Sequence, residues 1–204
     1  MEDTTKNGLS LSLKDYYTPL YQAALSISSS LDIDQVLQSI VRSITEAMSA
    51  KASALRLLEP ESGTMCMAAS YGLSDEYLHK GPIGLIRSQI DCTTLENRIT
   101  YIADVRTDER FQYSAAAAEE GLVSLLCVPL EVRGRTIGVL RVYTAAPQEF
   151  QDKDREFLAV LGSLAAQAIE NARLYARVKD SYSDMLGAFW GTDLSLNIAP
   201  DMAS

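Results

Sequence analysis

Apolar residues recur at helical spacing near the start of the chain. Seven of them stand three or four positions apart and therefore share one face of a helix: Ile33, Val36, Leu37, Ile40, Val41, Ile44 and Met48. Asp32 or Asp34 can cap the first turn of this helix. A weaker pattern of the same kind covers residues 11–30. The spacing predicts two helices, and the apolar face of the second must lie on a core.

Five segments predict β-strands, because they are rich in apolar and β-branched residues and are bounded by turn residues. Pro60 and Gly63 separate the first two, and Arg133-Gly134-Arg135 separates the last two, which predicts two antiparallel hairpins. Both faces of the last segment are partly apolar, as in a central strand. The predicted strands are 52–58, 64–71, 99–105, 124–132 and 136–144.

The middle of the chain is less regular. Gly72, Gly81, Pro82 and Gly84 interrupt the segment 72–98, where short helices are predicted at 74–80 and around 85–90. A further short helix is predicted within 106–121, which is polar at first and rich in alanine later.

A long helix is predicted over 152–185, with Asp152 as its N-cap. Nine positions keep the alternating four- and three-residue spacing of a coiled coil: Phe157, Leu161, Leu164, Ala168, Asn171, Tyr175, Val178, Tyr182 and Met185. Such a helix extends about 50 Å and should project beyond a domain of this size. In the alternative, it breaks near Ala172 and folds back on the core. Residues 187–204 are predicted to be a loose tail, from which Phe189, Trp190 and Leu194 could dock.

Several sequence segments, in their order and spacing, resemble the GAF domain family. The resemblance runs from about Leu20 to Tyr175. It rests on 31–37 (LDIDQVL), 69–73 (ASYGL), 101–105 (YIADV), 108–111 (DERF), 124–130 (SLLCVPL), Gly134, 137–140 (IGVL), 150–158 and 165–174. The chain is accordingly divided into an N-terminal segment with the start of a helix (1–19), a GAF domain (20–175) and a helical extension with a loose tail (176–204).

The resemblance implies an α+β fold of the GAF/PAS type. A central antiparallel sheet would carry the N- and C-terminal helices on one face and the loops of a ligand pocket on the other. Ligands in this family include cyclic nucleotides, linear tetrapyrroles, haem, 2-oxo acids and formate, and many members have no known ligand. Such domains commonly form dimers through terminal helices that pass a signal to an output domain. The sequence after Tyr175 is expected to leave no room for an output domain.

The irregular middle is where a pocket is expected. An apolar or aromatic residue there can equally belong to an ordinary core. Asp104 can cap a turn instead of anchoring a ligand, and Arg110 can pair with Asp104 or with an anionic ligand. The candidate ligand-binding residues are Tyr71, Tyr77, His79, Ile83, Ile86, Asp104, Arg110, Phe111 and Leu126, with Ile90 and Val128 as further wall candidates.

Composition limits the possible functions. The 204 residues are 47% hydrophobic and 22% charged, as in an ordinary globular protein. A net charge of −9 argues against a nucleic-acid partner, since binding to phosphates needs clustered Lys and Arg. The polar N-terminus has no signal-peptide core, and the uncharged stretch 157–169 is too short to cross a membrane. We therefore expect a cytoplasmic, bacterial-type protein with no membrane partner.

The three cysteines and single histidine raise the question of catalysis. Cys66, Cys92, Cys127 and His79 match no zinc-site spacing, and no CxxC motif is present. One GAF branch reduces free methionine-R-sulfoxide with cysteines in its pocket loops, a pattern this sequence does not reproduce. The Asn-Lys-X-Phe-Asp-Glu signature of phosphodiesterase GAF domains is absent. Asp91-Cys92 resembles only faintly the context of a bilin-attaching cysteine.

The sequence as a whole predicts a non-catalytic GAF sensory domain for signal transduction. An unidentified small molecule would bind its pocket, and the terminal helices of a homodimer would pass on the ligand state, with a signalling protein as a possible partner. The cofactor, if any, stays open. The alternatives are a methionine-R-sulfoxide reductase-like enzyme and a ligand-free scaffold that acts through protein contacts.

Overall fold

The structure, a computed structural model, describes residues 18, 21, 32–59, 61–79, 83–84 and 88–191, with side chains up to residue 185 in the last helix. Apart from residues 18 and 21, the helix expected over 11–30 lies outside the described residues. The same is true of Ile86 and of the tail after residue 191.

A six-stranded antiparallel sheet forms the centre of the domain, in the order β3-β2-β1-β6-β5-β4. Both predicted hairpins are confirmed, and β6 is central as expected. Strand β4 is shorter than predicted, because the chain turns at Asp104. The two-residue strand β3 was not predicted. The strands are β1 (Ala52–Glu59), β2 (Thr64–Tyr71), β3 (Ile83–Gly84), β4 (Thr100–Ile102), β5 (Leu125–Val132) and β6 (Arg135–Tyr143).

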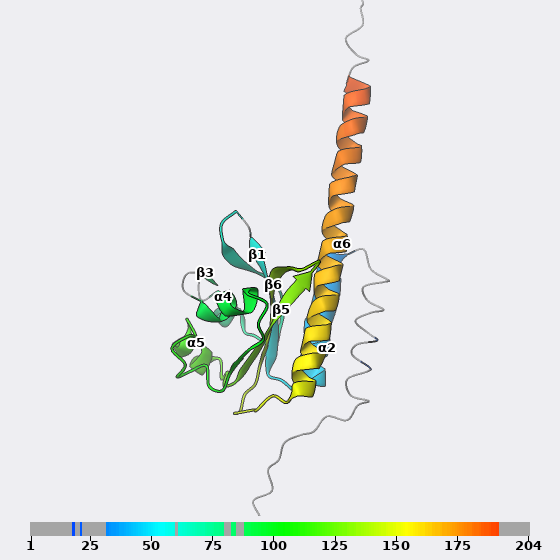
Figure 1. Cartoon of the computed structure of the whole chain (residues 1–204). Coiled ribbons are helices and arrows are strands. Elements are labelled where there is room, and N and C mark those ends of the chain that lie inside the picture. Colours follow the sequence, from blue (N-terminus) through cyan, green and yellow to red (C-terminus); the bar gives the residue numbers. More distant parts are fainter. Residues whose placement is uncertain are drawn as a thin grey trace, which may run out of the picture.

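Two helices cover one face of the sheet, which we call the helix face (Figure 1). They are α2 (Ile33–Ala47) and the first half of α6 (Asp152–Gly191). Asp32 caps α2 by accepting a hydrogen bond from the backbone N–H of Asp34 at 3.0 Å. The predicted apolar face of α2 is buried against β1, β2 and α6. The expected α+β fold, with these helices on one face, is confirmed.

Three short helices lie on the opposite face, the loop face, and two of them are labelled in Figure 1. They are α3 (Asp75–Leu78), α4 (Gln89–Leu95) and α5 (Ser114–Glu119). Helix α4 begins later than predicted, because the Ser88 hydroxyl caps it through the backbone N–H of Asp91. A second apolar cluster fills the space between these helices and the sheet.

Helix α6 is continuous for 40 residues and leaves the domain without a break at Ala172 (Figure 1). It therefore projects, and its helical backbone includes 187–191, where a loose tail was predicted. Asp152 is not the N-cap but the first helical residue, and the Asp154 carboxylate instead accepts a hydrogen bond from the backbone N–H of Gln151 at 2.8 Å. Beyond Ile169 the apolar residues at coiled-coil spacing are exposed: Tyr175, Val178, Tyr182 and Met185.

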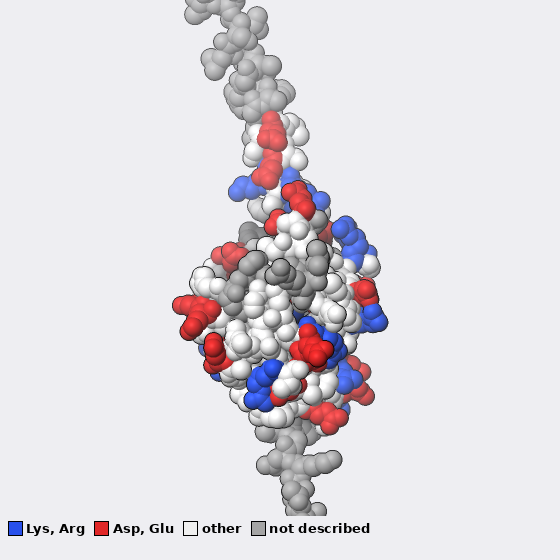
Figure 2. Space-filling view, turned by 90° about the vertical axis from the view of Figure 1, so that its left-hand side faces the viewer, with Lys and Arg blue, Asp and Glu red and all other residues white. Residues whose placement is uncertain are grey.

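On the face of the domain seen in Figure 2, charged side chains of both signs surround an uncharged area and continue along α6. Within the described part of the chain, no helix combines the length and the apolar character needed to cross a membrane.

Candidate functional site

Two arginines lie inside the domain, on the loop face of the sheet. Arg56 is on β1 and Arg141 is on the neighbouring strand β6, and their side chains are only 1% and 3% exposed. Arg56 is opposite Val139 and Arg141 is opposite Ala54, so both side chains leave the sheet on the same side as these residues of the loop-face cluster. Two like charges therefore share a desolvated region, which is unfavourable unless other groups compensate for them.

One buried carboxylate faces the arginines. Asp91, in the first turn of α4, is fully buried, and its Oδ1 accepts a hydrogen bond from Nη2 of Arg141 at 2.5 Å. Its Oδ2 accepts one from the Ser88 hydroxyl at 2.7 Å. Burial alone would raise the pKa of Asp91. Attraction by Arg141 and Arg56, together with the Ser88 hydrogen bond, outweighs burial and lowers this pKa below its ordinary value. Asp91 is therefore ionised and neutralises Arg141.

Arg56 is left without a comparable partner. Among the described residues, none forms a hydrogen bond with Nη1 or Nη2 of Arg56, or with Nε of Arg141. Burial, and then repulsion by Arg141, lowers the pKa of Arg56 from its ordinary value. The site thus contains two guanidinium groups, one carboxylate and three unused N–H-bearing nitrogens.

A small cavity of about 10 Å³ opens at these groups. That is room for about one water molecule. Its walls come from β1, β6, α3, the start of α4 with its N-cap, and the segment that precedes α5. The lining residues are Arg56, Tyr77, Ser88, Ile90, Phe111, Gln112, Tyr113 and Arg141. Its chemistry is that of a hydrogen-bond donor site with a surplus positive charge.

The family model for the GAF domain matches residues 30–170. The chain belongs to the GAF domain family. The nitrogen fixation protein VnfA of Azotobacter vinelandii is 26% identical over 171 residues, which are 80% of this chain and 32% of VnfA. The chain thus spans about a third of the length of that relative.

Solved structures share the fold of this GAF domain. The GAF domain of an Acinetobacter phosphoenolpyruvate-protein phosphotransferase is 25% identical with a TM-score of 0.67, and the match covers 78% of this chain and 94% of that one. A domain of a Sinorhizobium meliloti putative two-component sensor histidine kinase is 22% identical (TM-score 0.60; 72% and 96% covered). The free methionine-R-sulfoxide reductase of Neisseria meningitidis is 20% identical (TM-score 0.66; 81% and 96% covered). GAF domains therefore occur in sensor and signalling proteins, and a few of them are enzymes.

The candidate ligand-binding residues of this GAF domain do not gather at one place. Tyr77 and Phe111, together with Ile90, line the cavity. Tyr71 and Leu126 pack in the apolar cluster of the helix face, as does Val128. His79 is exposed, and its Nδ1 lies 2.7 Å from the carbonyl oxygen of Asp75 in the preceding turn. The backbone of Ile83 forms part of β3, its side chain is not described, and Ile86 lies outside the described residues.

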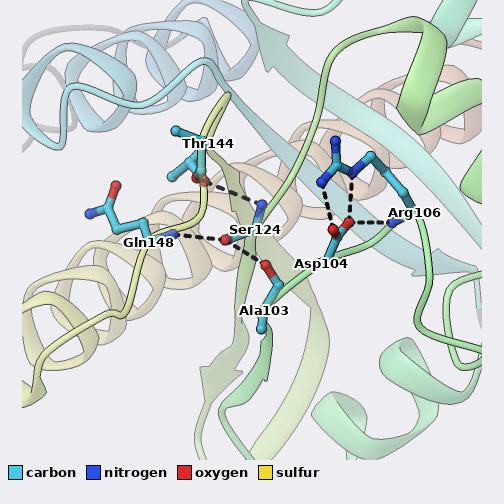
Figure 3. A network of polar contacts seen from close by, with 7 residues as sticks. Ala103, Asp104, Arg106, Ser124, Thr144 and Gln148 are labelled. Atoms are coloured by element: carbon cyan, nitrogen blue, oxygen red, sulfur yellow. Dashed lines mark hydrogen bonds and ion pairs between the residues drawn. The ribbon is translucent and has the colours of Figure 1, made fainter.

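Asp104 and Arg110 each have a local partner. The Asp104 carboxylate accepts hydrogen bonds from the backbone N–H and the guanidinium of Arg106, at 3.0, 2.8 and 2.6 Å (Figure 3). These bonds lower the pKa of Asp104 to about 2. Arg110 donates in the same way to Asp108, at 2.6 Å from Nη2. Asp104 therefore caps its turn, the alternative that the sequence had left open.

Ser124, close to Asp104, fastens the segment that leads into α6 to the sheet (Figure 3). Its hydroxyl donates to the carbonyl oxygen of Ala103 at 2.7 Å and accepts from the backbone N–H of Gln148 at 3.0 Å. The Tyr101 hydroxyl also donates to the carbonyl oxygen of Gln148. The start of α6 is thereby tied to the end of β4.

The charged residues at the cavity were absent from the sequence predictions. Arg56, Arg141 and Asp91 carry the polar chemistry there, and Ser88 and Gln112 support it. A signal existed for the arginines. Arg141 alternates in register with the apolar residues Val139 and Tyr143 of a central strand, and thus belongs to an inward-facing set. A charge at such a position is rarely buried without a function or a partner.

The three cysteines differ in their exposure. None of them is in a disulfide: Cys66 is exposed, Cys92 is half-buried and Cys127 is buried. Burial raises the pKa of Cys127 to about 11, so this thiol is protonated at neutral pH and is a poor nucleophile. In the described ranges, no group of His, Cys, Asp and Glu is placed to hold a metal ion.

Proposed function

We propose that this GAF domain is a non-catalytic sensory module of a signalling protein. A small molecule in the cavity at Arg56 would change how α6 packs on the sheet, and the projecting part of α6 would carry this change to a second copy of the chain. The observation that supports the proposal best is the cavity itself, because unused donors inside a core are costly unless a ligand engages them. A cytoplasmic location fits this proposal.

Strand β5 connects the two faces of the sheet. Its Cys127 belongs to the loop-face cluster with Tyr77 and Tyr143, whereas its Val128 belongs to the helix-face cluster. Helix α6 approaches this strand closely at Gly162, where a Cβ atom would lie 3.2 Å from the carbonyl oxygen of Pro129 and 3.3 Å from Val128. A shift of β5 caused by a ligand would therefore be felt directly by α6.

The exposed seam of α6 supports a dimer. Tyr175, Val178, Tyr182 and Met185 continue the coiled-coil spacing of the buried part of the helix, yet Val178 is 68% exposed in the single chain. A row of large apolar side chains on a projecting helix is typical of a surface that another protein covers. The same seam on a second copy has the matching spacing for a coiled coil.

Val178→Asp is expected to weaken this dimer at least about tenfold, since each of the two copies loses a buried valine worth roughly 1.5–3 kcal/mol. The dimer dissociation constant can be measured by sedimentation equilibrium. Ala176→Asp, which adds the same charge at an exposed position outside the seam, serves as the control and should leave the constant nearly unchanged. A wild-type chain that stays monomeric at high micromolar concentration would contradict the dimer.

Ligand binding is tested by a thermal-shift screen with cyclic nucleotides, amino acids, small carboxylates and uncharged metabolites. A ligand that binds only the folded state raises the unfolding midpoint by mass action. We expect at least one class to raise the midpoint of the wild type and not that of an Arg56→Met variant. If no compound acts on the wild type, the sensory function is wrong.

The ligand-free scaffold remains a second candidate, and the small volume of the cavity favours it. It predicts a dimer that forms normally and a thermal-shift screen in which no compound raises the unfolding midpoint.

The reductase alternative predicts turnover of free methionine-R-sulfoxide with a thiol reductant, abolished by Cys92→Ser. The buried, protonated Cys127 speaks against it.

A further inference from the structure

We propose that a chloride ion occupies the cavity at Arg56 when the domain is without its small-molecule ligand. The ion accepts hydrogen bonds from the terminal nitrogens of Arg56 and from Nε of Arg141. The inference goes beyond the sensory function, because the ion can bind whether or not a small molecule later displaces it. Three features support it: the charge balance of the site, the donors left unused, and the volume of the cavity.

The charge balance of the site lacks one negative charge among the described residues. Asp91 is the buried carboxylate on this face, and Arg141 binds it directly. Burial raises the pKa of Tyr77, so its hydroxyl is neutral. Burial likewise raises the pKa of Cys127, and its thiol is neutral too. Neither group can balance Arg56, and an anion in the cavity supplies the missing charge.

The unused donors come from two neighbouring strands. Nη1 and Nη2 of Arg56 on β1 and Nε of Arg141 on β6 have no hydrogen-bond partner among the described residues, and both side chains line the cavity. The Ser88 hydroxyl is already used, because it donates to Asp91. The Gln112 amide, whose Oε1 is also unpaired, can turn its NH₂ group toward the ion. A halide only accepts hydrogen bonds and takes them from any direction, so it suits a set of donors that do not share one plane.

The volume of the cavity selects a monatomic ion. About 10 Å³ is room for about one water molecule, and a chloride ion needs a similar space. Ile90 and Phe111 add apolar walls, so an anion that is weakly hydrated enters at a lower cost than a strongly hydrated one such as fluoride. A water molecule also fits, but it brings no charge and must place two hydrogens of its own beside donors. Chloride is therefore favoured over both.

The first test follows the unfolding midpoint of the full chain while sodium chloride replaces sodium gluconate at constant ionic strength, since gluconate is too large for the cavity. We expect a saturable rise for the wild type, of at least about 3 °C at ten times the dissociation constant. Arg56→Met should show no such rise, and in gluconate its midpoint should equal or exceed that of the wild type, because it lacks the unpaired buried charge. Arg135→Met removes an exposed arginine on β6 and should respond to chloride as the wild type does.

The second test locates the ion and needs no variant. In crystals of the full chain grown in sodium bromide, the heavier halide should give an anomalous difference peak in the cavity, within hydrogen-bonding reach of both Arg56 and Arg141. A water molecule gives no such peak.

Three results would each overturn the inference: equal midpoints of the wild type in chloride and gluconate, a chloride response that survives in Arg56→Met, or bromide crystals without a peak in the cavity. The ion and the sensory function can fail separately. If chloride fails and a compound of the thermal-shift screen binds, the ion is wrong and the sensory function stands. If chloride binds and no compound of the screen acts, the ion stands and the sensory function is wrong.

Discussion

Arg141→Met is expected to destabilise the domain by about 3–5 kcal/mol, because it leaves the Asp91 carboxylate buried without its main partner. The free energy of unfolding can be measured by urea denaturation at pH 7. Arg56→Met is the matched control, since it removes an arginine of equal burial that has no partner for its terminal nitrogens. It should cost little or nothing. Equal losses in the two variants would contradict the assignment of Asp91 to Arg141.

The difference in the free energy of unfolding between the wild type and Arg141→Met is expected to depend on pH. The pKa of Asp91 is lowered in the folded state, so its ion pair contributes stability above the ordinary pKa of 3.8 and loses it as the pH falls through the lowered pKa. Without Arg141, less attraction opposes the effect of burial, so the pKa of Asp91 is higher and the carboxyl group is protonated at higher pH. The difference in unfolding free energy between the wild type and Arg141→Met should therefore be constant near neutral pH and become smaller in acid. A difference in unfolding free energy that stays constant to pH values well below 3.8 would contradict this interpretation.

Gly138→Ala is expected to destabilise the domain by more than about 3 kcal/mol, because the added methyl group has no room between two strands. A Cβ atom at this position would lie 2.2 Å from the carbonyl oxygen of Arg56 and 3.1 Å from its carbonyl carbon. Both are backbone atoms, so β1 would have to move away from β6 and take Arg56 with it.

Gly134→Ala is the control for this substitution. Gly134 has a φ of +74° in the β5–β6 turn, and a Cβ there would meet nothing within 4 Å. Alanine in this left-handed conformation costs about 1–2 kcal/mol and leaves the strands in place. A loss in Gly138→Ala no larger than that in Gly134→Ala, measured by urea denaturation, would contradict the close approach of β1 and β6.

Much of the fold could be predicted from local patterns. The apolar spacing from Ile33 to Met48 predicted the bounds of α2 to within a residue, since residues at this spacing form the buried face of one helix. The turn residues around Gly63 and Gly134 fixed both hairpins. The predicted N-cap of α6 was wrong, because Asp152 is its first helical residue, and only the geometry shows that the Asp154 carboxylate bonds back to Gln151. Strand β3 is held by pairing with β2, a distant segment with no local signal.

The site was harder to predict, because it depends on which face of the sheet each side chain lies on. Leu126 and Cys127 are neighbours in an apolar strand, yet the first packs in the helix-face cluster and the second in the loop-face cluster. The apolar residues on both faces of β5 give no indication of which side carries α6. Two of the aromatic residues predicted as pocket walls, Tyr77 and Phe111, do line the cavity. Arg56 and Arg141 were not predicted, although charged residues within buried strands were the stronger signal.

The central claim is that the cavity and the projecting helix are coupled, and sedimentation equilibrium with a ligand found in the thermal-shift screen tests it most directly. Coupling between two sites changes an affinity typically 5- to 150-fold. The dimer dissociation constant of the wild-type chain should therefore change at least about fivefold between the ligand-free chain and the chain saturated with that ligand. The constant of Arg56→Met should be the same with and without the ligand. A wild-type constant that is equal in both conditions, or a chain that is monomeric in both, would contradict the account.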